Sequence, residues 1–258
     1  MTALLEVSGL SVRYGGVAAL RDVDLSVAAG TVTGLIGPNG AGKTTFIDVI
    51  TGFAPATTGR IVFDGRRIDG LAPHRRARLG LVRTFQTLQL LDELTVRENV
   101  LAAAERGPWW AVLPDLVRPV REGARDRVDR LLAGLGLEAV GHEVVAELPH
   151  GRRKVVAIAR ALAADPRLLV LDEPAAGLDP QERTGLASTL RVLVDEGVTV
   201  VLVDHDMGLV LRVCDTIWVL DFGSVVAHGP PDRVREDPRV VKAYLGHGVD
   251  GMAGGVAT

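Results

Sequence analysis

Short apolar runs with strand-like spacing dominate the first quarter of the chain. Residues 4–7, 11–14 and 23–27 are such runs, rich in valine and leucine. Near residue 61 another begins, and it leads into Asp64 and Gly65, a pair typical of tight hairpin turns. We expect these segments to form an antiparallel β layer.

Further along, strand-like and helical patterns alternate. Residues 31–36, 168–171 and 198–203 are short apolar runs, whereas residues 154–164 and 181–195 repeat their apolar positions with helical spacing. Alternation of this kind predicts a parallel sheet with helices on its faces. The chain is therefore expected to have an α/β fold.

The middle of the chain is helical in pattern. The helical spacing of apolar residues extends from about residue 88 to 149, and residues 125–135 are clearly amphipathic. This pattern predicts a helical subdomain at about residues 88–164, inserted in a domain that spans residues 1–246. Within it, Trp109 and Trp110 are expected to fill a small core, with a partner-binding surface as the alternative. Residues 247–258 are expected to be a disordered tail.

Composition narrows the class of protein. The 258 residues carry a net charge of −3, which gives no argument for nucleic acid or an anionic membrane surface. No uncharged apolar run approaches the roughly 20 residues that span a bilayer, and the N-terminus lacks a signal-peptide pattern. The single cysteine, Cys214, is expected to be buried and unreactive. The basic run 74–78 is expected to be the solvated face of a short helix.

The strongest chemical signal is the sequence Gly-Pro-Asn-Gly-Ala-Gly-Lys-Thr-Thr at residues 37–45, between a strand-like run and a helical one. Its glycines let the backbone wrap around a polyphosphate, which successive N–H groups and the helix N-terminus bind. Lys43 is placed to reach the terminal phosphates, and the Thr44 hydroxyl can ligate Mg²⁺. The predicted nucleotide-binding residues here are Gly37, Pro38, Asn39, Gly40, Ala41, Gly42, Lys43, Thr44 and Thr45.

Two carboxylates, Asp172 and Glu173, follow the apolar run 168–171. Ligands bind outside the carboxyl ends of parallel strands, so this pair is expected beside the phosphates. Asp172 can hold Mg²⁺, directly or through a water, and Glu173 can orient or deprotonate the water that attacks the γ-phosphate. A helix-capping role is the alternative, made plausible by the proline that follows.

These residues together resemble the nucleotide-binding subunit of an ATP-binding-cassette (ABC) transporter, and the resemblance covers the chain from residue 4 to about 246. It implies a P-loop NTPase fold: a RecA-like parallel sheet with an N-terminal antiparallel β layer and an inserted α-helical subdomain. Four further site residues follow from it. Tyr14 would stack on adenine (the alternative is a core tyrosine), Gln86 would sense Mg²⁺ and the attacking water, Asp179 would lie in the loop crossing the dimer interface, and His205 would contact the γ-phosphate.

The resemblance implies ATP hydrolysis with Mg²⁺ in a dimer that sandwiches two ATP molecules. The catalytic residues would be Lys43, Gln86, Glu173 and His205, and the metal ligands Thr44, Gln86 and Asp172.

One segment departs from the family pattern. Family members usually read Leu-Ser-Gly-Gly-Gln before the helix that leads to the acidic strand, where this chain reads Leu-Pro-His-Gly-Arg at residues 148–152. In the family this helix N-terminus faces ATP held by the other protomer. Pro149 offers neither a hydroxyl nor an N–H. We expect a working but altered nucleotide contact made by Pro149, His150, Gly151 and Arg152, with Arg153 as a further cation that could help.

The sequences at residues 83–86, 94–100 and 237–246 resemble the longer ATPase of branched-chain amino-acid importers. This implies that the chain powers uptake of branched-chain amino acids or related small polar solutes, although urea and amide importers use near relatives. The implied partners are a second ABC ATPase subunit (identical or different), two transmembrane permeases and, indirectly, an extracytoplasmic solute-binding protein, with no nucleic acid. The implied location is peripheral, on the cytoplasmic face of the bacterial plasma membrane.

Two other functions are compatible with the sequence. A soluble ABC ATPase acting in DNA repair or translation would usually carry tandem cassettes, zinc modules or basic extensions, and the sequence shows none of these. A regulatory cassette would hold ATP and hydrolyse it weakly; Glu173 and His205 argue against this function, and Pro149 argues for it.

Overall fold

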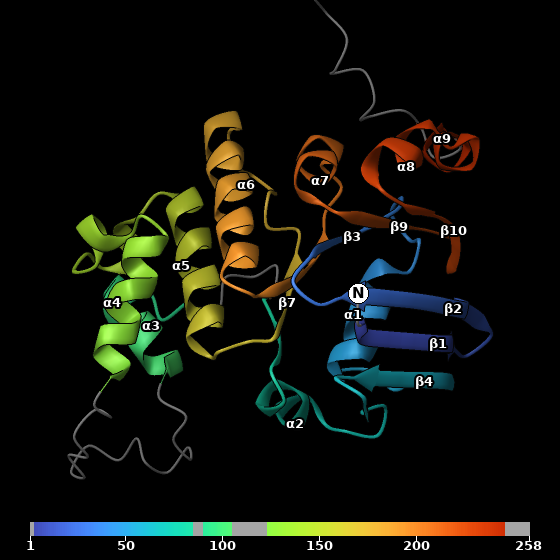
Figure 1. Cartoon of the computed structure of the whole chain (residues 1–258), viewed down its shortest axis with the longest axis horizontal. Helices are drawn as coiled ribbons and strands as arrows, with labels where there is room; N and C mark the ends of the chain where they lie inside the picture. Colours follow the sequence, from blue (N-terminus) through green and yellow to red (C-terminus); the bar gives the residue numbers. More distant parts are fainter. Residues whose placement is uncertain (1–2, 85–89, 105–122, 246–258) are drawn as a thin grey trace, which may run out of the picture.

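Two β-sheets organise the chain in the computed structural model, which describes residues 3–84, 90–104 and 123–245 (Figure 1). The first sheet is antiparallel, in the order β2-β1-β4-β5. Its strands are β1 (Ala3–Tyr14), β2 (Val17–Ala28), β4 (Thr58–Phe63) and β5 (Arg66–Arg67). The predicted N-terminal layer is thus present, and the turn between β4 and β5 has positive φ at Asp64 (50°) and Gly65 (71°), as expected.

The second sheet has six strands in the order β10-β9-β3-β8-β7-β6. Every neighbouring pair from β9 to β6 is parallel, and β10 is antiparallel to β9. The strands are β3 (Val32–Ile36), β6 (Leu81–Arg83), β7 (Leu168–Asp172), β8 (Thr199–Val203), β9 (Thr216–Asp221) and β10 (Ser224–Gly229). Because β3, β7 and β8 are buried along their whole length, they read as continuous apolar runs, as parallel strands covered on both faces do.

Helices cover both faces of the parallel sheet. The described helices are α1 (Lys43–Thr51), α2 (Pro73–Arg78), α3 (Val96–Ala104), α4 (Ala124–Gly134), α5 (His150–Ala163), α6 (Pro180–Asp195), α7 (Met207–Val213), α8 (Pro231–Glu236) and α9 (Pro238–Leu245), with short 3₁₀ turns at Glu138–Val140 and Val145–Glu147. Of these, α3 and α4 pack with α5 and not on the sheet. In the described residues, no helix is both long and apolar enough to cross a membrane.

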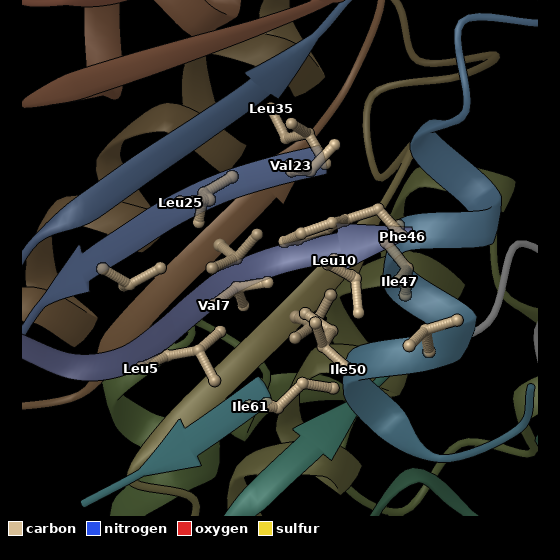
Figure 2. Close-up of a cluster of buried hydrophobic side chains, with 14 of the residues drawn as sticks. Leu5, Val7, Leu10, Val23, Leu25, Leu35, Phe46, Ile47, Ile50 and Ile61 are labelled. Carbon is tan, nitrogen blue, oxygen red and sulfur yellow. The ribbon is translucent and has the colours of Figure 1, made fainter. Parts of the chain in front are cut away.

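The core lies in three clusters. The first joins the antiparallel layer to α1 and one face of the parallel sheet; Figure 2 shows Phe46, Ile47 and Ile50 of α1 pointing at leucines and valines of β1 and β2. The second fills the opposite face under α5, α6 and α7. A third joins α3, α4 and α5, the helices that lie farthest from β1 and β2 in Figure 1.

Cys214 belongs to the second cluster and is buried, as predicted. Burial raises the pKa of its thiol from 9.0 to about 12, so the reactive thiolate is disfavoured.

One prediction about the surface is confirmed at four positions, His74, Arg75, Ala77 and Arg78, and wrong at the fifth. The basic run 74–78 does form a short helix, α2, but Arg76 is only 3% exposed. Its guanidinium donates hydrogen bonds to the carbonyl oxygens of Val49 (2.7 Å) and Ile50 (2.8 Å) at the end of α1, and to those of Leu71 and Asp69. The run therefore anchors α2 to α1 instead of forming a fully solvated face.

Candidate functional site

The phosphate-binding loop joins β3 to α1 in a conformation that only glycine can adopt at its two closest contacts. Gly37 has φ 151°, and a Cβ atom there would lie 2.1 Å from the carbonyl oxygen of Leu220. Gly42, with φ 105°, caps α1, and a Cβ atom there would lie 2.7 Å from the carbonyl oxygen of Ala19. No side chain caps α1, so its first amides are available to an anion.

Lys43 points back over this loop. Its Nζ donates to the carbonyl oxygens of Gly37 (2.6 Å) and Pro38 (3.0 Å), and the residue is 8% exposed. Burial lowers the pKa of Lys43, and the negative charges of Glu173 and Asp172 act in the opposite direction. The structure thus brings the predicted lysine and both predicted carboxylates into one electrostatic neighbourhood.

A cleft of about 400 Å³ lies over the loop. Glu173 is the residue from the acidic pair that lines it. The other lining residues come from the loop, the start of α1, the N-terminal part of β2 and the β9–β10 turn: Asn39, Gly40, Ala41, Gly42, Lys43, Thr44, Thr45, Val17, Ala18, Ala19, Arg21 and Phe222.

Asp172 and Glu173 have different environments. Asp172 ends β7 with a side chain that is 3% exposed, and its Oδ2 accepts a hydrogen bond from Arg83 Nη2 at 2.8 Å. Arg83 also pairs with Asp48 of α1, so it links the helix after the phosphate loop to the acidic strand. Because Asp179 is the N-cap of α6, neither member of the acidic pair caps that helix.

Glu173 and His205 lie side by side at the ends of β7 and β8. The Glu173 amide donates to the carbonyl oxygen of Val203 (2.7 Å), and His205 Nδ1 lies 4.0 Å from Glu173 Oε1. Glu173 has φ 49°, a left-handed backbone that is uncommon outside glycine. The His205 side chain is 63% exposed.

Tyr14, predicted from the resemblance, does not belong to this group. Tyr14 is 53% exposed, so the alternative of a core tyrosine is wrong. It pairs with Val17, which lines the cleft, although Tyr14 itself does not. Gln86 and the pair Trp109 and Trp110 lie outside the described residues.

The segment at residues 148–152 packs against its own chain, next to the N-terminus of α6. Pro149 occupies the N-cap position of α5, and Pro149, His150 and Arg152 are all exposed. Gly151 is buried, and a Cβ atom there would lie 1.9 Å from Glu182 Oε1. Glu182 forms a capping box with Asp179, its carboxylate accepting from the Asp179 amide at 2.9 Å.

Arg153 does not join the exposed cations of this segment, because it forms an ion pair with Asp92. None of residues 148–152 is among the described residues that line the phosphate cleft. The cleft and this segment are therefore separate surfaces of one chain.

Sequence reasoning missed three charged residues of the site. They are Arg83, which pairs with Asp172, and the buried residues Lys154 and Asp204, both of which contact the loop after Glu173. The sequence held partial signals: Arg83 is in the same short motif as Gln86, and Asp204 directly precedes His205.

A phosphate-binding loop between a buried parallel strand and a helix, with acidic residues at the end of a nearby strand, defines a P-loop NTPase. The ABC transporter family model matches residues 20–176, and a model for branched-chain amino acid ATP-binding cassette transporters matches residues 224–250. The chain belongs to the ABC transporter family, as an ATP-binding subunit that hydrolyses ATP to power transport.

Similar proteins cover almost the whole chain. It is 41% identical over 249 residues to the high-affinity branched-chain amino acid transport ATP-binding protein BraF of Pseudomonas aeruginosa (94% of this chain, 98% of BraF). It is 38% identical over 249 residues to the high-affinity branched-chain amino acid transport ATP-binding protein LivG of Escherichia coli K12 (94% of this chain, 98% of LivG). The crystal structure of the ADP conformation of MJ1267, an ATP-binding cassette of an ABC transporter, superposes with a TM-score of 0.85 at 34% identity (95% of this chain, 100% of that one).

Proposed function

We propose that this chain is the ATPase subunit of an importer for branched-chain amino acids, acting on the cytoplasmic face of the bacterial plasma membrane. The observation that carries the substrate class is the match of residues 224–250 to the branched-chain amino-acid cassette model, supported by the likeness to BraF and LivG. The proposed partners are a second ABC ATPase subunit, two transmembrane permeases and, through them, an extracytoplasmic solute-binding protein.

In the proposed mechanism, the loop amides and Lys43 bind the β- and γ-phosphates. Lys43 now donates to loop carbonyls, so it exchanges those bonds for phosphate oxygens when nucleotide binds. Glu173 then orients and deprotonates the attacking water, because it is the only one of the two acidic residues that lines the cleft. His205, 4.0 Å from Glu173, contacts the γ-phosphate from the side of β8.

Mg²⁺ fits the donors at this site. The Thr44 hydroxyl and the Asp172 carboxylate are hard oxygen ligands of the kind that Mg²⁺ prefers, usually together with phosphate oxygens and waters. Bound there with Gln86, it would neutralise charge on the phosphates. Arg83 already offsets the charge of Asp172, and the ion pair fixes that carboxylate at the end of β7.

The 148–152 segment serves ATP bound to a second protomer in this proposal. Two observations support it: the segment is exposed at Pro149, His150 and Arg152, and it does not line the cleft of its own chain. Tyr14 stacks on adenine from the rim of the cleft, and Asp179 lies in the loop that crosses the interface. The two protomers come apart when hydrolysis adds charge repulsion, and the Gln86 region passes that motion to the permeases.

Uptake in cells tests the substrate class. In a strain that lacks the gene for this chain, we expect accumulation of radiolabelled leucine, isoleucine and valine to fall to background and to return with the wild-type gene. The gene encoding Glu173→Gln, expressed at the same level, should not restore it. Uptake of urea, measured in parallel, tests the nearest alternative, which is a urea importer.

Loss of urea uptake with normal leucine uptake would reject the substrate class but keep the transporter function. Purified wild-type complex that binds ATP yet releases no phosphate would instead support a regulatory cassette.

A further inference from the structure

Lys154 is a buried lysine on α5 that binds the loop following Glu173. Its Nζ donates to the carbonyl oxygen of Pro174 (2.9 Å) and to that of Ala176, and the residue is 8% exposed. Removing an ammonium group from water is costly unless hydrogen bonds and opposite charge offset the loss. The loop carbonyls supply those hydrogen bonds.

Asp204 binds the same loop through a backbone amide. It is fully buried, its Oδ2 accepts from the amide of Ala175 (3.0 Å), and its Oδ1 accepts from the amide of Asp206 (2.9 Å). The residue between Asp204 and Asp206 is His205, whose Nδ1 lies 3.7 Å from Asp204 Oδ1. Asp204 therefore fixes both the loop after Glu173 and the turn that carries His205.

Lys154 and Asp204 also attract each other. Burial lowers the pKa of Lys154, and Asp204 is the first of the acidic groups that oppose this change, followed by Glu173 and Glu182. Residues 174–176 thus have two carbonyl oxygens bound by a cation and the amide between them bound by an anion.

Glu173 directly precedes this clamped segment and has an unfavourable left-handed backbone, with φ 49°. For a residue other than glycine this conformation is unfavourable and persists only where the surroundings impose it. The hydrogen bond from its amide to the carbonyl oxygen of Val203 fixes one side, and the clamped segment fixes the other.

We propose that Lys154 and Asp204 are positioning residues that clamp residues 174–176 and thereby hold Glu173 against His205 for ATP hydrolysis. The inference rests on the proposed role of Glu173. It also connects α5, which begins at the 148–152 segment, to the loop that follows Glu173 within one protomer. Packing alone would not require a charged end on this side chain, because the remainder of the buried α5 face is apolar or small.

Steady-state kinetics of the assembled transporter test the clamp. Lys154→Met keeps the length of the side chain and removes its donors, and we expect it to lower kcat for ATP about tenfold to a hundredfold while KM changes less than about threefold, because misplacing a catalytic group affects the transition state most. Lys154→Arg restores donors and should recover most of the loss. Asp204→Asn should resemble Lys154→Met, and the double variant should be little worse than either single variant if the two residues act as a unit.

The matched control is Lys242→Met, at an exposed lysine of α9, for which we expect wild-type kcat and KM. Circular dichroism and the thermal midpoint identify any variant that fails to fold; if Lys154→Met does, Lys154→Arg and Asp204→Asn carry the test. Wild-type kcat in folded Lys154→Met or Asp204→Asn would overturn the clamp, as would an equal loss of nucleotide affinity and kcat. Turnover retained in Glu173→Gln would instead overturn the proposed role of Glu173.

Discussion

The phosphate loop and the 148–152 segment are both parts of the proposed ATP site, but different surroundings constrain them. Gly37 and Gly42 are each fixed by backbone atoms of their own chain, at Leu220 and Ala19. In the 148–152 segment only Gly151 and Leu148 are buried, and Pro149, His150 and Arg152 face outward.

The difference shows which contacts restrict the residues allowed in each of the two segments. The loop must satisfy the packing of its own fold, which leaves little room for change and explains why it matches the family pattern. The exposed part of the second segment has no such restriction within the chain, so only what it faces outside limits it. This is where the sequence departs from Leu-Ser-Gly-Gly-Gln.

The largest effect is expected from Glu173→Gln, a change in the cleft that the phosphate loop lines. A positioned general base contributes roughly 10²–10⁴-fold to rate, so we expect kcat to fall by that factor while ATP affinity stays within a few-fold. Phosphate release and nucleotide binding, measured on the same preparation, separate the two effects. Appreciable hydrolysis by this variant would show that another group activates the water.

The exposed segment should respond more weakly. One charge-assisted hydrogen bond contributes about 1.5–3 kcal/mol, so Arg152→Ala or His150→Ala should lower ATP turnover by roughly tenfold to a hundredfold if that cation replaces the missing serine contact. Neither variant should lower the thermal midpoint by much, since both side chains are exposed. Unchanged turnover in both would refute the idea that these cations compensate for Pro149.

A pair of glycine substitutions measures how far the segment depends on its own chain. Gly151→Ala should displace the Glu182 carboxylate and break its capping box with Asp179, at a cost of about 0.5–2 kcal/mol in unfolding free energy. Gly185→Ala, at an exposed position inside α6 with open space around it, should instead stabilise by about 0.5–1 kcal/mol. Chemical denaturation of both variants gives the comparison. Equal stability would mean that Gly151 is not restricted as described.

The smallest effect is expected on the rate of thiol labelling at Cys214. Its Sγ packs closely against β3, the strand leading to the phosphate loop, because a Cβ atom added to Gly34 would lie 2.9 Å from it. The folded thiol, with pKa about 12, holds its proton more strongly than an unfolded one near 9.0, so its contribution to stability is complete below pH 9 and is lost as the pH rises toward 12. Thiol labelling at pH 8 should be slow in the wild type and equally slow in Arg152→Ala. Rapid labelling of either native protein would contradict a rigid core beneath the loop.

The sequence predicted the elements whose pattern is local. The buried strands β3, β7 and β8 and the hairpin at Asp64 were recognisable because composition and spacing within a few residues determine them. Predicted boundaries were less accurate. The runs 4–7 and 11–14 belong to one strand, β1, whose alternation is interrupted by irregular pairing between Val7 and Leu10, and α5 begins at His150, four residues before the predicted start, because its first residues are polar.

The sequence could not reveal partners that are distant along the chain. Lys154 and the carbonyl oxygens it binds are separated by 20 and 22 residues, and Asp204 lies 29 residues from the amide of Ala175. Buried charges of this kind have no periodic pattern, and only the fold brings them together. The roles of the residues predicted by resemblance, including Tyr14 and Gln86, stay predictions.

Arg76 gives α1 an asymmetry that bears on nucleotide capture. Its guanidinium lies against the negative end of the α1 macrodipole, whereas the positive end opens into the phosphate cleft without a side-chain cap. One end of the helix is thus compensated permanently, and the other gains its counter-charge only when a polyanion arrives. The Arg76 guanidinium donates to four carbonyl oxygens, and the single ammonium of a lysine cannot reach all of them. Arg76→Lys should therefore not be tolerated, although arginine and lysine often replace each other.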